Sequence, residues 1–174
     1  MPSKNVIFEK LSSAHLKELK ELSRRTFSDA FGDQNKAEDL QAYLNNAFSD
    51  EQLKTELLNP LSEFYFAKRK VETLGYFKIN LGNAQTEFKD EDAMELERIY
   101  VKSEFQNQKT GQKMLDTVIE MAVQRKMKYL WLGVWEHNRR GISFYLKNGF
   151  EAAGSHPYMV GNARQTDKIM KLFF

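Results

Sequence analysis

The sequence predicts one α/β domain across residues 1–174, with a mixed, twisted sheet of about six or seven strands and helices on both faces. Two observations lead to this fold class. Residues 94–101 are predicted to be a buried strand, residues 128–134 are a near-continuous apolar run of strand length, and an amphipathic helix pattern separates them. A strand, a crossover helix and a second strand form a βαβ unit with parallel strands. In addition, no internal repeat or low-complexity linker divides the chain.

The N-terminal third is predicted to form a short strand followed by helices. The strand covers residues 5–9, and Ser12 or Ser13 is placed to cap the next helix. Residues 27–59 continue as short helical pieces, which are broken at residues 32–35 and ended by Pro60. The apolar face of the first helix comprises Leu16, Leu19, Leu22 and Phe27.

Two further strands precede the βαβ unit. Residues 63–68 and 73–81 are rich in aromatic side chains, and the short link between them is charged. A link of this kind predicts a β-hairpin. Residues 82–92 form a polar loop that leads into the central strand.

The C-terminal part is predicted to add one helix and two strands. The helix begins at Asn138 and ends at Asn148, with Gly149 in the position of a C-cap glycine. Residues 150–154 and 164–173 are predicted to be a closing pair of strands, joined by the loop SHPYMVGN.

Composition and charge exclude several classes of protein. Hydrophobic residues make up 41% of the sequence and charged residues 29%, as in soluble globular proteins, and no apolar run is long enough to cross a membrane. The formal net charge of +2 is too balanced to indicate a nucleic-acid partner. The absence of cysteine excludes disulfides, thiolate catalysis and thiolate metal sites. Because a signal-peptide pattern is also lacking, we expect a cytoplasmic protein.

The turn before the helix of the βαβ unit is a candidate anion site. The helix is predicted to open near Gly111. A helix start leaves its first backbone N–H groups without partners and carries the positive end of the helix dipole. We therefore expect this turn to hold a phosphate group. The apolar face of the helix comprises Met114, Leu115, Val118, Ile119 and Ala122.

Segments on both sides of this helix resemble motifs of the GNAT superfamily of N-acetyltransferases. Residues 99–101 (IYV) and 105–111 (FQNQKTG) are similar to the family's strand and to its Q/R-x-x-G-x-G/A pyrophosphate loop. Residues 138–145 (NRRGISFY) and 148–150 (NGF) resemble its later N-x-x-A-x-x-F-Y helix and G-F exit. The resemblance implies a sheet whose central strands splay apart and acetyl-CoA as a cosubstrate.

The resemblance also implies which residues contact coenzyme A. Backbone groups of Ile99 and Val101 would pair with the pantetheine arm like an added strand. Asn138 would bond to the same arm or cap its own helix. The full implied set is Ile99, Tyr100, Val101, Gln106, Asn107, Gln108, Lys109, Thr110, Gly111, Gln112, Asn138, Tyr145 and Lys147.

The chain departs from the superfamily pattern at two positions. Lys109 stands where a glycine is usual, and a lysine at positive φ would cost roughly 1 kcal/mol or somewhat more. We therefore expect Lys109 at negative φ, with its ammonium near a phosphate. Gly141 replaces the usual alanine, which costs about 1 kcal/mol of helix propensity and should leave the chemistry unchanged. Arg139 and Arg140 flank the cofactor region, and surface charge explains them equally well.

A closer resemblance covers nearly the whole chain. The segments FSDAFGDQN, YLNNAFSDEQL, WLGVWEHN and GFEAAGSHPYMVGNARQTDKIM are similar to bacterial PaiA-type spermidine/spermine N-acetyltransferases. This resemblance implies a polyamine acceptor. A protein N-terminus, a lysine side chain and an aminoglycoside remain rival acceptors, and a homodimer remains open. A regulatory module that binds acetyl-CoA without catalysis is the alternative from another class.

Acetyl transfer to an amine requires a group that removes a proton. An alkyl ammonium with a pKa near 10.4 is neutral in only about one of a few thousand molecules at pH 7. Glu95 and Glu97 lie two apart on the central strand and so share one face. Of the two, we predict that Glu97 is the general base. The alternative is that these glutamates form surface ion pairs beside Arg98.

The leaving thiolate needs a proton donor. Tyr145 matches the family's general acid, and a phenol with a pKa of about 10 is protonated at neutral pH. Core packing is the alternative role of this tyrosine. Because no cysteine can carry the acetyl group, we expect direct attack in a ternary complex.

Three other groups of side chains have weaker functional interpretations. His15, His137 and His156 lack metal-ligand spacing, so no metal is expected. The acidic residues of the segment 27–59 form either a solvated helical surface or the mouth of a site for a cationic substrate. Aromatic residues that could line an acceptor channel or belong to the core are Trp131, Trp135, Phe64, Phe66, Tyr76 and Phe77.

Overall fold

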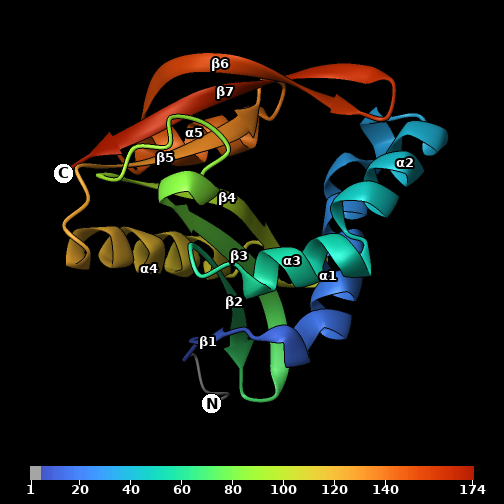
Figure 1. The fold of residues 1–174 in the computed structure, drawn as a ribbon, viewed down its shortest axis with the longest axis horizontal. Helices are drawn as coiled ribbons and strands as arrows, with labels where there is room; N and C mark the ends of the chain where they lie inside the picture. The colour runs from blue at the N-terminus through green and yellow to red at the C-terminus, as the bar shows by residue number, and fades with distance from the viewer. Residues whose placement is uncertain (1–4) are drawn as a thin grey trace.

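The computed structural model describes residues 5–174 as a seven-stranded mixed sheet with α-helices on both faces (Figure 1). The strands are β1 (Ile7–Lys10), β2 (Ser62–Arg69), β3 (Glu72–Leu81), β4 (Ala93–Val101), β5 (Tyr129–Trp135), β6 (Glu151–Val160) and β7 (Ala163–Phe173). The helices are α1 (Leu16–Phe31), α2 (Ala37–Ala47), α3 (Asp50–Leu58), α4 (Thr110–Gln124) and α5 (Arg139–Lys147). The predicted fold class is confirmed. Within residues 5–174, no helix combines the length and apolarity that a membrane crossing requires.

The sheet order places the βαβ unit at its centre. The order is β1-β2-β3-β4-β5-β7-β6, and β4 and β5 are the parallel pair. The pairing of β4 with β5 ends at Glu95 opposite Trp131. On its other edge, β4 stays paired with β3 as far as Val101 opposite Gly75. The second half of β4 therefore has one edge without a strand partner, as the splayed central pair requires.

Two apolar cores lie on opposite faces of the sheet, because alternate residues of each strand point to opposite sides. In β2, Tyr65 belongs to the core under α4 and α5, whereas Phe64 and Phe66 belong to the core under α1 and α3. Figure 1 shows α1, α2 and α3 grouped at the right of the view, with α4 at the left. The predicted apolar face of α4 is buried or packed in the first core.

The first closing strand, β6, extends well beyond the predicted residues 150–154, whereas β7 agrees with the predicted residues 164–173 to within one residue. β6 and β7 are paired from Glu151 opposite Lys171 to Val160 opposite Ala163, so most of the predicted loop is strand. Pro157 fits because β6 is the edge strand and has a free side. A bulge at Gly154, where φ is +140°, absorbs the irregular register.

The tip of this hairpin reaches α2, as Figure 1 shows at the upper right. The backbone N–H of Asn162 donates to the Asp39 carboxylate at 2.9 Å. Gly161, at φ +59°, makes the contact sterically feasible, because a Cβ there would lie 2.5 Å from the Cα of Asp39. The hairpin and the N-terminal helices are thereby joined over the face opposite α4.

Candidate active site

Two cavities meet where β4 and β5 separate. The larger has a volume of about 710 Å³ and lies beside the N-termini of α4 and α5. The smaller, of about 360 Å³, lies between the sheet, α1, α2 and β6. Six residues line both cavities and form their common wall: Phe31, Ile99, Tyr100, Trp135, Asn138 and Tyr145.

The start of α4 forms one side of the larger cavity. Lys109 is the N-cap residue and makes no side-chain capping hydrogen bond. Helix geometry leaves the amides of the first turn, beginning with Thr110 and Gly111, without intrahelical partners. Gly111 faces open space, since a Cβ there would meet only the Val101 side chain at 3.9 Å. The sequence predicts an anion site at this helix opening, and the open space beside these amides supports that prediction.

The predicted backbone conformation of Lys109 is wrong. Its φ is +63°, in the left-handed region, and Asn107 two residues earlier is also left-handed at φ +62°. The chain has to reverse tightly between the loop after β4 and the first turn of α4, and left-handed residues achieve this reversal. A lysine in this conformation costs on the order of 1 kcal/mol or more. Lys109 is therefore a site of local backbone strain.

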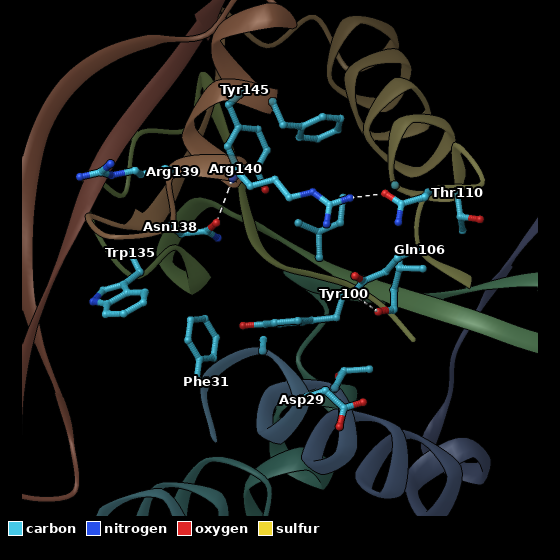
Figure 2. A pocket seen from close by; sticks show the side chains of 18 of the residues that line it. Asp29, Phe31, Tyr100, Gln106, Thr110, Trp135, Asn138, Arg139, Arg140 and Tyr145 are labelled. Atoms are coloured by element: carbon cyan, nitrogen blue, oxygen red, sulfur yellow. Dashed lines mark hydrogen bonds between the residues drawn. The ribbon is translucent and has the colours of Figure 1, made fainter. Parts of the chain in front are cut away.

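Positive charge gathers around this helix start. Lys109, Arg139 and Arg140 line the larger cavity, and Asp29 is its one acidic lining residue within the described chain. The Arg140 guanidinium donates to the side-chain oxygen of Asn107, which ties α5 to the loop before α4 (Figure 2). Cationic side chains next to unpaired helix amides favour phosphate or diphosphate groups.

Polar side chains of the loop and of α4 fix the shape of this cavity. Gln106 Nε2 donates to the Val101 carbonyl at 3.3 Å, so the loop folds back on the end of β4. Gln112 Nε2 donates to Asn148 Oδ1 at 2.7 Å and links α4 to α5. Figure 2 shows Tyr145, Arg140 and Gln106 around the same space above Tyr100.

The structure brings most of the predicted cofactor residues together and leaves two outside. Gln108 contacts Arg69 and the Glu104 carbonyl, each at 3.3 Å, and does not line the cavity. Lys147 is exposed in the last turn of α5, also away from the cavity. The residues that do line it are Ile99, Tyr100, Val101, Gln106, Asn107, Lys109, Thr110, Gly111, Gln112, Asn138 and Tyr145.

Tyr145 lies at the junction of the two cavities. Its side chain is 8% exposed, and its hydroxyl makes no hydrogen bond within residues 5–174. Burial raises the pKa of this hydroxyl well above 10, so it is protonated at neutral pH. Asn138 caps α5 by accepting from the Gly141 N–H at 2.9 Å. Tyr145 can therefore donate a proton to a group at the junction.

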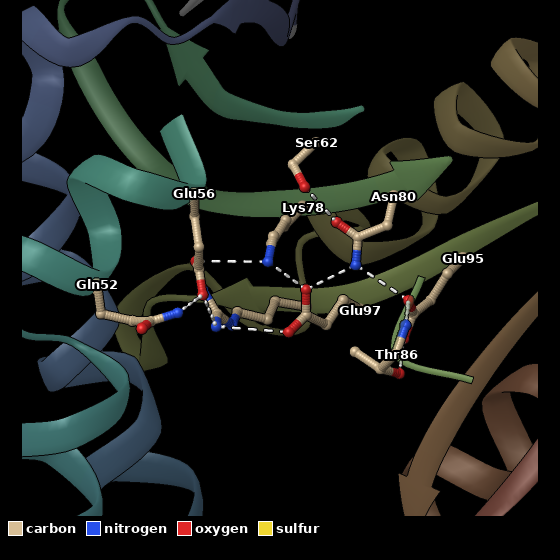
Figure 3. A network of polar contacts seen from close by, with 9 residues as sticks. Gln52, Glu56, Ser62, Lys78, Asn80, Thr86, Glu95 and Glu97 are labelled. Atoms are coloured by element: carbon tan, nitrogen blue, oxygen red, sulfur yellow. Dashed lines mark hydrogen bonds and ion pairs between the residues drawn. The ribbon is translucent and has the colours of Figure 1, made fainter. Parts of the chain in front are cut away.

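Glu95 and Glu97 share one face of β4, as predicted, and both accept from Asn80 Nδ2, at 3.0 and 2.8 Å (Figure 3). Glu97 also forms ion pairs with Lys78 and Arg98. Against the opposing effect of burial, these cations lower the pKa of Glu97 to about 2. The carboxylate of Glu97 is therefore ionised and fully engaged in ion pairs, but these pairs are largely buried and do not lie on the surface.

Glu56 completes this buried network from α3. Arg98 donates to its two carboxylate oxygens at 2.8 and 3.1 Å, in a bidentate arrangement. Lys78 lies 3.4 Å from the same carboxylate. One acidic residue of the segment 27–59 is thus a partner of the central strand.

Glu95 has a different environment from Glu97. Thr86 donates to it from its backbone N–H, at 2.8 Å, and from its hydroxyl, at 2.5 Å. Burial, together with the charge of Glu97, raises the pKa of Glu95. Both carboxylates line the smaller cavity.

The smaller cavity also contains an acid that sequence reasoning missed. Asp167 lies within the predicted closing strand, and its only signal was a lone acidic residue in the stretch RQTDKIM. Burial raises its pKa to about 6, an effect that His156 opposes. Trp131 and Trp135 line this cavity, whereas Phe64, Phe66, Tyr76 and Phe77 are core residues. The part of the chain that the structure describes contains no cluster of three or more potential metal ligands.

The fold and the two cavities define a class of α/β enzyme that binds an extended anionic cosubstrate against an unpaired strand edge. A second cavity, with acidic and aromatic side chains in its wall, lies next to the first. The residues fit coenzyme A: amides and cations for its phosphates, and the free edge of Ile99 to Val101 for its pantetheine amides.

Comparisons with known proteins identify the family. A model of the acetyltransferase (GNAT) family matches residues 16–150. The chain is 36% identical over 161 residues to an uncharacterized N-acetyltransferase in the pepI 3' region of Lactobacillus delbrueckii subsp. lactis, a match that covers 92% of this chain and 93% of that relative. The chain therefore belongs to the acetyltransferase (GNAT) family.

Two solved structures illustrate the shared fold. PaiA N-acetyltransferase from Thermoplasma acidophilum, in complex with coenzyme A, is 22% identical with a TM-score of 0.79, over 98% of this chain and 99% of that one. The ribosomal-protein-S18-alanine N-acetyltransferase from Escherichia coli is 18% identical with a TM-score of 0.71, over 97% of this chain and 94% of that one.

Family membership defines the enzyme class. The chain is an N-acetyltransferase, and its acyl donor is acetyl-CoA. Members of this family acetylate amines of small molecules or of proteins. The superfamily, the enzyme class and the cosubstrate predicted from the sequence are confirmed.

Proposed function

We propose that this chain transfers an acetyl group from acetyl-CoA to a primary amine of a polyamine such as spermidine or spermine. The observation that carries the proposal is the meeting of a cationic and an acidic cavity at Tyr145. The larger cavity suits the phosphates of the donor, and the smaller cavity suits a cationic acceptor. The two substrates would then react directly in a ternary complex.

The larger cavity supports a defined mode of cofactor binding. The diphosphate would lie on the amides of Thr110 and Gly111, with Lys109 and Arg140 supplying charge. The pantetheine arm would pair with the free edge of Ile99 and Val101, and one backbone N–H there would polarise the thioester carbonyl. Tyr100, Gln106, Asn107, Gln112 and Asn138 would contact the cofactor around this path.

The smaller cavity supports an acceptor with several positive charges. Its wall includes three carboxylates, those of Glu95, Glu97 and Asp167, and one guanidinium, that of Arg98. The aromatic side chains around them can hold alkylammonium groups against their faces. They are Phe27, Phe31, Tyr43, Phe48, Trp131, Trp135 and Tyr158.

Similarity to PaiA-type enzymes supports a polyamine as the acceptor. Sequence segments along nearly the whole chain resemble PaiA-type enzymes, and a PaiA N-acetyltransferase shares the fold. The similarity to an enzyme that acts on the alanine of ribosomal protein S18 keeps a protein N-terminus as the rival acceptor.

Tyr145 is the proposed general acid. Its protonated hydroxyl would donate to the thiolate of coenzyme A as the carbon–sulfur bond breaks. Glu97 was predicted to be the general base. With a pKa of about 2 and two cationic partners, its carboxylate is a weak base, and its placement favours holding Lys78 and Arg98 on the cavity wall. The catalytic use of Glu97 stays a prediction that Glu97→Gln tests.

An amine panel tests the proposed function. The full chain is incubated with acetyl-CoA and one amine at a time: spermidine, spermine, a peptide with an N-terminal alanine, a peptide with an internal lysine, and an aminoglycoside. Release of coenzyme A and the mass of the product are measured. We expect the highest kcat/KM with the polyamines. A preference for either peptide, or no turnover with any amine despite acetyl-CoA binding, would refute the polyamine assignment.

A further inference from the structure

Asp167 occupies a niche at the end of the parallel strand pair. It lies in β7, opposite Trp135 of β5 on one side and His156 of β6 on the other. Its carboxylate lies over Gly133, where a Cβ would be 3.0 Å from Asp167 Oδ2. Gly133 is two residues beyond Trp131, the last β5 residue paired with β4. The missing side chain at position 133 thus leaves room for a carboxylate where the strands part.

The carboxylate of Asp167 differs from the other two in the cavity by its lack of partners. Within residues 5–174 it accepts no hydrogen bond and forms no salt bridge. Glu97, by contrast, is held by Lys78, Arg98 and Asn80. Asp167 lines the same cavity as Tyr145, whose hydroxyl is also without a partner in the described chain. A carboxylate of this kind is free to bind a cation that enters the cavity.

We propose that Asp167 is the catalytic base, which binds the acceptor ammonium and removes its proton before attack. This inference rests on the proposed function, because it needs an amine in the smaller cavity. It adds a residue that neither the sequence motifs nor the family match assigns.

The charged and titratable groups around Asp167 are consistent with this role. Burial raises its pKa to about 6, so the carboxylate is mostly ionised at neutral pH but binds a proton far more readily than Glu97. Proton transfer from an ammonium group is therefore more favourable to Asp167 than to Glu97. The other groups that line this cavity are Tyr43 of α2, Glu95, Glu97, Arg98 and Tyr100 of β4, Tyr145 of α5, and His156 and Tyr158 of β6.

The protons and bonds balance with Asp167 and Tyr145 in these roles. Asp167 takes one proton from the ammonium and later releases it to solvent. The neutral nitrogen then forms a bond to the acetyl carbonyl carbon, and the bond from that carbon to sulfur breaks. The thiolate takes a proton from Tyr145, and the second proton lost by the nitrogen restores the tyrosine hydroxyl through solvent. The products are the N-acetylated amine, coenzyme A and one proton.

The test compares Asp167→Asn with Glu97→Gln, using spermidine as the acceptor. Calorimetry with acetyl-CoA and the thermal midpoint report cofactor binding and folding, and kcat/KM is measured from pH 5 to pH 9. Asp33→Asn is the control, because Asp33 is exposed and lines neither cavity. Gly133→Ala is a second variant, since its methyl group would push the Asp167 carboxylate away.

We expect Asp167→Asn to lower kcat/KM at pH 7 by about a hundredfold or more, the usual contribution of a general base. Acetyl-CoA affinity should stay within about twofold of wild type, as judged by a free-energy change well under 1 kcal/mol. The acid limb of the wild-type profile, near pH 6, should disappear in this variant and persist in Glu97→Gln. Gly133→Ala, like Asp167→Asn, should lower kcat.

Three outcomes would overturn the inference. If Asp167→Asn keeps nearly full activity, or keeps the acid limb, Asp167 is not the base although the proposed function survives. If Glu97→Gln loses the limb instead, Glu97 is the base. If wild type binds acetyl-CoA but acetylates neither spermidine nor any other panel amine, the proposed function fails and this inference fails with it.

Discussion

A side chain at position 141 would collide with Asn138. A Cβ on Gly141 would lie 2.7 Å from Asn138 Nδ2 and 3.1 Å from Oδ1, while the Gly141 N–H donates to that same oxygen at 2.9 Å. The sequence suggested that glycine here only weakens α5. In the structure, the absence of a side chain at Gly141 leaves room for the Asn138 side chain. Asn138 can then cap α5 beside the junction of the two cavities.

Gly141→Ala should therefore weaken cofactor binding. The added methyl group displaces Asn138, and loss of the cap, about 1 kcal/mol, offsets the gain in helix propensity of similar size. We expect little change in thermal midpoint but about fivefold weaker acetyl-CoA binding, which corresponds to about 1 kcal/mol. Calorimetry checks the affinity, and Ser143→Ala, on an exposed position of the same helix, is the control. Unchanged affinity would mean that Asn138 does not act on the cofactor.

Tyr145→Phe should separate chemistry from binding and folding. Because the Tyr145 hydroxyl has no hydrogen-bond partner in residues 5–174, its removal should leave the thermal midpoint nearly unchanged. We expect kcat to fall by roughly ten- to a thousandfold with acetyl-CoA affinity retained. Tyr129→Phe is the matched control, since Tyr129 lines neither cavity. Full turnover by Tyr145→Phe would exclude the tyrosine as the acid.

Lys109→Gly should raise stability and lower affinity. Glycine relieves the left-handed strain at φ +63°, which we expect to add about 1 kcal/mol to the free energy of unfolding. The lost ammonium should weaken acetyl-CoA binding, with a smaller dependence of Kd on salt than in wild type. The exposed Lys126, also left-handed at φ +58°, offers a control, because Lys126→Gly should stabilise without changing affinity. If Lys109→Gly and Lys126→Gly bind acetyl-CoA equally well, the Lys109 ammonium does not contact the phosphates.

The buried pair of Glu97 with Lys78 and Arg98 should make stability depend on acid pH. The pKa of Glu97 falls from 4.5 to about 2 on folding, so its contribution is complete above pH 4.5 and is lost as the pH falls through 2. That contribution is on the order of 3 kcal/mol. Glu95 and Asp167, whose pKa values are raised, act in the opposite direction.

Glu97→Gln should accordingly unfold more easily at pH 7, because two buried cations lose a partner, at a cost of roughly 3 kcal/mol. Between pH 5 and pH 2 its free energy of unfolding should change less than that of wild type. Urea unfolding at several pH values measures both quantities. Glu120→Gln, on an exposed position of α4, should match wild type throughout. A variant as acid-sensitive as wild type would show that Glu97 carries no such linkage.

Short sequence patterns correctly predicted the features that depend on residues close together along the chain. The βαβ unit follows from apolar periodicity, and the start of α4 beside Gly111 follows from the helix pattern. The length of β6 was missed because Pro157 and Gly154 are loop signals, yet an edge strand and a bulge accommodate them. The φ of Lys109 depends on how the loop meets the helix, which no single residue encodes.

Asp167 illustrates a second limit of sequence reasoning. Its proximity to Gly133 arises from pairing between β5 and β7, which are separated by a helix and a strand along the chain. The ion-pair network of Glu56, Lys78, Glu97 and Arg98 likewise joins α3, β3 and β4. Contacts between residues far apart in the chain depend on the register of the sheet. The sequence shows that an acid and a glycine lie in strands, but it does not show that they meet.

The bond between the hairpin tip and α2 has a consequence for how specificity could change. Tyr43 of α2 and Tyr158 of β6 line the smaller cavity, and the hydrogen bond from Asn162 to Asp39 holds α2 and the β6–β7 hairpin together. The larger cavity, which is proposed to bind acetyl-CoA, is lined by no residue of α2 or of the β6–β7 hairpin. Substitutions in α2 and in the β6–β7 hairpin could therefore change which amine is accepted. The residues proposed to bind acetyl-CoA would stay the same.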